Sequence, residues 1–76
     1  MKNKKSIISV FVTSVIQKRT AKHLVNKISL LDSVRACNFD LEDCDKILRV
    51  ESEFEISKTV TKLVNSKGFK CVELLD

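Results

Sequence analysis

The sequence predicts an α+β domain in which two helices cover one face of a four-stranded antiparallel sheet. Apolar residues alternate in short segments, as in strands, and recur at steps of three and four in two longer ones, as in amphipathic helices. The 76 residues are enough for one domain, and they include no proline and a single glycine. With so few turn-forming residues, an all-β chain of many tight hairpins is excluded.

The first strand is expected over residues 6–13, where large apolar residues alternate with a period of two and give the strand unequal faces. Ser14 and Gln17 have the spacing of a capping box, a local device that starts a helix. The first helix is expected over residues 17–30. Its apolar stripe consists of Ala21, Leu24, Ile28 and Leu31.

The second and third strands are expected over residues 34–41 and 46–51, as an antiparallel hairpin. Residues 42–45 form a tight acidic turn between them, which we expect at the opposite end of the sheet from Gln17. The inward-facing residues are Cys37, Phe39 and Leu41 on the second strand and Leu48 and Val50 on the third.

The second helix is expected to end near Ser66 and to be followed by a last strand over residues 69–75. Ser52 and Glu55 form another capping-box pattern. Gly68 stands where a left-handed residue closes a helix. The apolar stripe of this helix consists of Ile56, Val60, Leu63 and Val64.

The order strand, helix, strand, strand, helix, strand indicates a ferredoxin-like sandwich with the first and third strands in the centre. One domain covers residues 1–76, and residues 1–5 are a basic tail. Residues 1–16 also have the basic and apolar regions of an export signal, and their role stays open, although they lack a small-residue cleavage site. No run reaches the ~20 apolar residues that span a membrane.

Charge and cysteine content narrow the function classes. Residues 1–31 contain seven Lys or Arg and no acid, whereas residues 32–76 contain seven basic and ten acidic residues. The net charge of +4 allows an anionic partner without requiring one. The cysteine count is odd, with no Cys-x-x-Cys pair, which favours reduced thiols and a cytoplasmic location.

Each cysteine has its own expected environment. Cys37 is expected to be a buried, inert thiol among apolar neighbours. Cys44 is expected to be exposed in the acidic turn, where the adjacent carboxylates make it a poor nucleophile. Strand alternation leaves open whether Cys71 points into the core or away from it.

Three segments resemble the heavy-metal-associated domain, the fold of small copper chaperones and of the amino-terminal modules of metal-pumping ATPases. They are Val12-Thr13-Ser14-Val15 entering the first turn, Val-Arg-Ala-Cys-Asn-Phe-Asp-Leu at residues 34–41, and Lys67-Gly68-Phe69-Lys70-Cys71. The resemblance covers about residues 6–75. It implies the ferredoxin-like fold and a link to metal transport.

That family carries a methionine followed by Cys-x-x-Cys where the first loop meets the first helix. The resemblance places Val15 at the methionine position, Gln17 at the first cysteine and Thr20 at the second. Two thiolates hold soft metal ions, whereas Gln17 and Thr20 offer neutral oxygen atoms beside Lys18 and Arg19. We therefore expect no metal ligand and no cofactor at this loop.

Two other surfaces are candidates for binding. Lys18, Arg19 and Lys22 surround the expected start of the first helix, whose free amides favour an anion, so this end of the helix is a candidate surface for an anion or a partner. Ile7, Phe11 and Ile47 are expected on the sheet face away from the helices, where they could form a docking or dimer surface. An RNA-binding sheet needs more exposed aromatic residues than Phe11 alone.

Catalysis is not expected. The chain has no Ser-His-Asp spacing and no glycine-rich phosphate loop, and its one histidine, His23, is expected at the surface without an activating partner. The sequence favours a protein-interaction or adaptor module, with another protein or a second copy as partner. One alternative is a metal binder with unconventional cysteine ligands between chains. A second is anion or nucleic-acid binding through Lys18 and Arg19.

Overall fold

A computed structural model describes residues 6–41 and 46–74. The acidic turn with Cys44, the basic tail and Leu75 lie outside the described residues. The elements follow the predicted order: β1 (Ile7–Thr13), α1 (Lys18–Ser29), β2 (Val34–Asp40), β3 (Ile47–Ser52), α2 (Ser57–Ser66) and β4 (Cys71–Glu73). Helix α1 is one residue shorter at each end than the expected range of 17–30. Helix α2 ends at Ser66, as expected.

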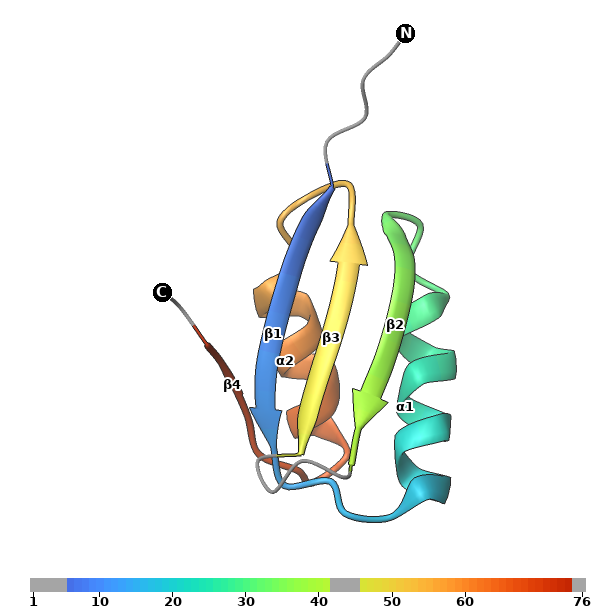
Figure 1. Cartoon of the computed structure of the whole chain (residues 1–76), viewed down its shortest axis with the longest axis vertical. Coiled ribbons are helices and arrows are strands. Elements are labelled where there is room, and N and C mark those ends of the chain that lie inside the picture. The colour runs from blue at the N-terminus through green and yellow to red at the C-terminus, as the bar shows by residue number, and fades with distance from the viewer. Residues whose placement is uncertain (1–5, 42–45, 75–76) are drawn as a thin grey trace, which may run out of the picture.

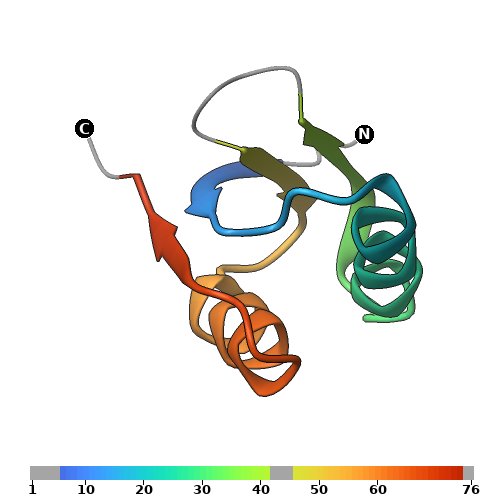
Figure 2. The ribbon, with the colours of Figure 1, turned by 90° about the horizontal axis from the view of Figure 1, so that it is seen from below.

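The four strands form one antiparallel sheet in the order β2-β3-β1-β4, so β1 and β3 are central, as predicted. Both helices lie on the same side of this sheet, with α1 beside β2 and α2 behind β1 and β3 (Figures 1 and 2). The predicted α+β class is confirmed, and the strand order is compatible with a ferredoxin-like arrangement.

The residues that flank the acidic turn, Leu41 and Lys46, are described, and they lie at the same end of the sheet as the loop leading to Gln17, whereas the sequence placed the turn at the opposite end. β1 ends at Thr13, whose backbone N–H donates a 3.2 Å hydrogen bond to the carbonyl oxygen of Lys46, the residue just before β3. The end of β2, the start of β3 and the start of α1 therefore share one end of the molecule (Figure 1). A β-α-β-β path requires this, because β1 and β2 run in the same direction and each ends there.

Side chains from both helices and all four strands form one apolar core. Phe11, Val15, Leu24, Ile28, Leu48, Val60 and Val64 have no exposed surface, and Ala21, Val50 and Cys71 are nearly buried. The predicted helix stripes are confirmed, with Leu31, Ile56 and Leu63 half-buried at their edges. The inward side of β2 is also as predicted, since Cys37 and Phe39 pack against the core.

Neither predicted capping box forms. Gln17 and Ile56 are the N-cap residues of α1 and α2, and neither makes a side-chain capping hydrogen bond. The Ser52 hydroxyl instead donates to the carbonyl oxygen of Phe54 at 2.7 Å. The Ser57 hydroxyl donates to the carboxylate of Glu55 at 2.8 Å, so this glutamate binds a side chain and not the amide of Ser52.

Gly68 closes α2 as predicted. Its φ of +92° lies in the left-handed region, which glycine adopts at little cost. The N–H of Gly68 donates to Asn65 O at 2.9 Å and that of Phe69 donates to Val64 O at 3.4 Å, which is the Schellman pattern. Phe69 then packs half-buried against the core, and β4 begins only at Cys71, two residues later than expected.

We predict that Phe11→Ala lowers the free energy of unfolding by about 3–5 kcal/mol, because it leaves a cavity in the core. The matched control is Phe54→Ala, since Phe54 is 66% exposed and its loss should change stability by no more than about 0.5 kcal/mol. Urea denaturation measures both values. Equal effects of the two substitutions would contradict the placement of Phe11.

Candidate functional site

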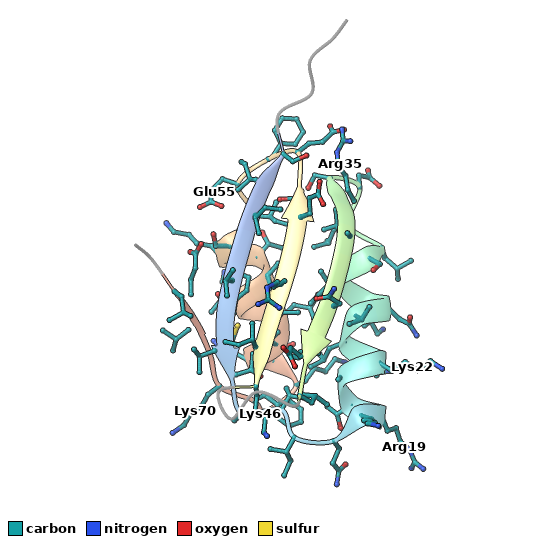
Figure 3. All side chains as sticks on the ribbon, in the orientation of Figure 1. Arg19, Lys22, Arg35, Lys46, Glu55 and Lys70 are labelled. Atoms are coloured by element: carbon teal, nitrogen blue, oxygen red, sulfur yellow. The ribbon has the colours of Figure 1, made fainter. Side chains whose placement is uncertain are left out.

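The loop between β1 and α1 is fastened to two other segments. The Thr13 hydroxyl donates to Lys46 O at 2.9 Å and accepts the N–H of Val15 at 3.2 Å. Ser14 and Lys70 pair twice: the N–H of Lys70 donates to the Ser14 hydroxyl at 2.9 Å, and the N–H of Ser14 donates to Lys70 O at 3.2 Å. Lys46 and Lys70 therefore lie close to this loop (Figure 3).

Of the three positions that the resemblance would assign to a metal loop, two are accessible and one is buried. Val15, at the methionine position, is fully buried and anchors the loop. Gln17 is exposed and Thr20 is half-exposed at the start of α1. Within residues 6–41 and 46–74, no three His, Cys, Asp or Glu side chains come together in a way that could hold a metal ion.

The structure divides the three cations of the predicted anion site between two hollows. Lys18 and Lys22 line a groove of about 630 Å³ beside β2. Arg19 faces a separate hollow of about 370 Å³ with Thr20, His23 and Lys67. His23 is exposed, as expected. The start of α1 is therefore basic on two sides and offers no single pocket in which all three predicted cations converge.

The two described cysteines are free thiols on opposite edges of the sheet. Cys37 lies on β2 and Cys71 on β4, so two strands separate them by about 14 Å. They cannot share a metal ion within one chain. Cys71, whose direction the sequence left open, points into the core.

Burial controls the acidity of both thiols. It raises the pKa of Cys37 from 9.0 to about 11. The pKa of Cys71 is also raised, first by burial; a hydrogen bond with the Thr61 side chain opposes this shift, and the negative charge of Glu73 adds to it. Cys37 is half-buried, where full burial was expected, and its raised pKa makes it a protonated, unreactive thiol near neutral pH, in agreement with its expected inertness.

The predicted docking surface of Ile7, Phe11 and Ile47 is wrong in its composition. Phe11 pairs with Leu48, and both are fully buried on the helix side of the sheet. Ile7 is on this same side, because it is four residues from Phe11 in the strand. Ile47 does lie on the open face but is only 6% exposed, so it contributes little surface.

The open face has apolar residues at the alternate positions of β1 and on β4. Val12 pairs with Ile47 on one side and with Val72 on the other, which forms an apolar row across three strands. The N–H of Leu74 donates to Val10 O at 2.7 Å, which brings Leu74 beside the same strand. We define the apolar half-face as Ile8, Val10, Val12, Val72 and Leu74.

This apolar half-face is accessible. Ile8 is 59% exposed, Val72 64% and Leu74 51%, while Val10 and Val12 are half-buried. The rest of the open face, on β3 and β2, carries polar and charged residues that include Arg49 and Glu51. Alternation along β1 could have identified the apolar half-face, had Phe11 been assigned to the core.

Comparison with models of protein families, with curated proteins and with solved structures finds no match to this chain. Among the helices in the described part of the chain, none is long and apolar enough to cross a membrane.

We predict that Cys37 reacts slowly with iodoacetamide and that its rate rises about tenfold per pH unit between pH 7 and pH 10. The thiolate is the reactive form, and a pKa of about 11 leaves about 100-fold less thiolate at pH 8 than a pKa of 9.0. Peptide mapping of the alkylated chain gives the rate for this residue, with the urea-unfolded chain as control. A rate that levels off below pH 9 would disprove the assigned burial.

Proposed function

We propose that this chain is a small non-catalytic module of the heavy-metal-associated type that docks to protein through its open sheet face and does not hold soft metal in its loop. The partner is another protein or a second copy of the chain. The observation that carries the proposal is the apolar half-face, which no described helix covers.

The chemistry of the apolar half-face supports docking. Five aliphatic side chains lie together on neighbouring strands, and three of them are more than half exposed. Covering such surface removes apolar area from water, which stabilises a complex by about 25 cal/mol per Å² of area buried before the costs of association. Charged residues on the rest of the face, such as Arg49 and Glu51, supply the polar border typical of an interface.

The loop chemistry supports the absence of a soft-metal site. Gln17 and Thr20 carry neutral oxygens where the family has thiolates, and soft metal ions prefer sulfur. Lys18 and Arg19 add positive charge beside them, which opposes a cation. The distance between Cys37 and Cys71 also argues against a site made from the thiols of one described chain.

Nucleic-acid binding by the sheet is less well supported. Base stacking on such a sheet needs exposed aromatic side chains on its open face, and Phe11 is in the core. A cytoplasmic location is part of the proposal. The free thiols Cys37 and Cys71 support it, because reduced cysteines are usual in that compartment.

We predict that the Gln17→Cys/Thr20→Cys variant binds one copper(I) ion per chain, whereas the parent does not compete for copper(I) with a chelator. Residues 17 and 20 are three apart at a helix start, where their side chains are neighbours, and both are accessible, so the thiols can converge. Amide shifts along residues 13–22 report binding at the loop. Tight copper(I) capture by the parent at this loop would refute the proposal.

We predict that Val72→Glu weakens docking through the apolar half-face by at least about tenfold, because a carboxylate in an apolar contact must be desolvated. If the partner is a second copy of the chain, sedimentation measured over a range of concentrations gives the strength of this self-association. Photo-crosslinking in cells from position 8, with and without Val72→Glu, measures docking to another protein, since Ile8 is an exposed member of the same face. Leu30→Glu is the matched control, since Leu30 is an exposed aliphatic residue away from this face.

One combined result of sedimentation and photo-crosslinking would contradict docking. It is a parent chain that stays monomeric at every concentration and also gives no discrete adduct from position 8. An equal effect of Leu30→Glu and Val72→Glu would show that general surface hydrophobicity, and not this face, drives association.

A further inference from the structure

The groove beside β2 has a feature that none of the surfaces described above shares: it follows the free edge of the sheet. Its strand-side lining is an unbroken run, residues 37–41. Consecutive strand residues point to opposite faces, so a hollow that touches all of them runs along the edge of the strand. β2 is the outermost strand, and no described strand pairs with its outer side.

Helix α1 forms the other wall of this groove. Its lining residues are Lys18, Ala21, Lys22 and Val25, which are spaced by three or four and so share one side of the helix. In Figure 1 the helix runs beside β2 along its length, and in Figure 2 it lies next to the outer strand. The groove thus has a strand edge on one side and a helix on the other.

The polar groups of the strand edge decide what kind of occupant fits. An edge strand presents backbone N–H and C=O groups that no neighbouring strand satisfies. An extended peptide can pair with these groups and place alternate side chains into the groove, which is the β-strand addition mode of recognition. Four residues of β2, 37–40, line the groove, which corresponds to about 13 Å of extended chain, while the carbonyl oxygen of Leu41, just past the strand, already accepts a 3.2 Å hydrogen bond from Lys46 Nζ.

The charged and apolar side chains that line the groove indicate which residue types the peptide would carry. Lys18, Lys22 and Arg49 line the groove, and the one ion pair among the described residues, Arg35–Glu53, uses none of them. Asp40 is the only acidic residue among the described residues that line the groove. Its floor is apolar, formed by Ala21, Val25, Cys37, Phe39 and Leu41.

We propose that this groove binds an extended peptide of alternating acidic and apolar residues, which adds to β2 as a fifth strand. The acidic side chains meet Lys18, Lys22 and Arg49, and the apolar ones cover Val25 and Phe39. This site follows the β2 edge of the sheet, whereas the apolar half-face lies on β1 and β4 toward the other edge, and only Arg49, which stands on the open face beside Val10, borders both. It therefore does not depend on the function proposed above.

The probe is an acetylated seven-residue peptide of alternating Glu and Val, with a fluorescent label, and binding is measured by anisotropy on the full chain. We expect saturable binding that weakens as salt is added. The same peptide with Lys in place of Glu should bind at least about tenfold more weakly, because it would repel the groove cations. Absence of saturable binding of the Glu peptide up to about 1 mM overturns the proposal.

Two variants test the location. Lys22→Glu should weaken binding of the Glu peptide about tenfold. The matched control is Lys27→Glu, since Lys27 is exposed on the same helix but does not line the groove, and its effect should be less than about twofold. Val72→Glu should leave the affinity unchanged, which separates this site from the apolar half-face. An equal loss of peptide affinity for Lys22→Glu and Lys27→Glu would show that the peptide does not bind in this groove.

Two modified peptides test strand addition. One carries N-methyl groups on its odd-numbered amides and the other on its even-numbered amides. Because only alternate amides of a strand face a given neighbour, one of the two should lose binding and the other should retain it. Full retention by both peptides would mean that the groove takes acidic ligands without backbone pairing, and would overturn strand addition. Slowed amide exchange in residues 36–40 is the expected structural readout.

Discussion

The structure depends on the placement of Phe11, Thr13 and Val15 on the helix side of β1 and the loop that follows it. Phe11 and Val15 are fully buried, and the Thr13 hydroxyl ties the strand end to Lys46 and to Val15. Because side chains alternate along β1, burying Phe11 also buries Ser9, which is two residues before it. The buried Ser9 hydroxyl has no hydrogen-bond partner in the described structure, which lowers stability. A lone buried hydroxyl costs about 1–3 kcal/mol, less than the roughly 3–5 kcal/mol that a buried Phe contributes.

The same constraint sets the character of the open face. A strand has a period of two, so burying Phe11 turns Ile8, Val10 and Val12 outward. With Val72 on the neighbouring strand they make a face that is apolar on β1 and β4 and, apart from the buried Ile47, polar or charged on β3 and β2. The apolar character of the open face thus follows from core packing, while the loop at Gln17 and Thr20 carries oxygen atoms and positive charge.

Much of the fold could be predicted from the sequence. Both helix stripes, the left-handed Gly68, the central strands and the inward side of β2 follow from local patterns. The side of β1 that is buried could not be predicted, because its two series of residues are similarly apolar and only tertiary packing distinguishes them. The capping boxes failed because Ser14 and Ser52 bond to Lys70 and Phe54 instead. The groove beside β2 needs α1 and β2 together, and no local pattern contains both.

The most direct test of this account is a set of nuclear Overhauser contacts from the Phe11 ring in the full chain. The account predicts contacts from the ring to the methyl groups of Leu24 and Leu48, which lie in the same buried cluster. It also predicts contacts between the methyl groups of Val12 and Val72, which pair on the open face. Contacts from the Phe11 ring to Ile47 and Val72, with none to Leu24, would contradict it.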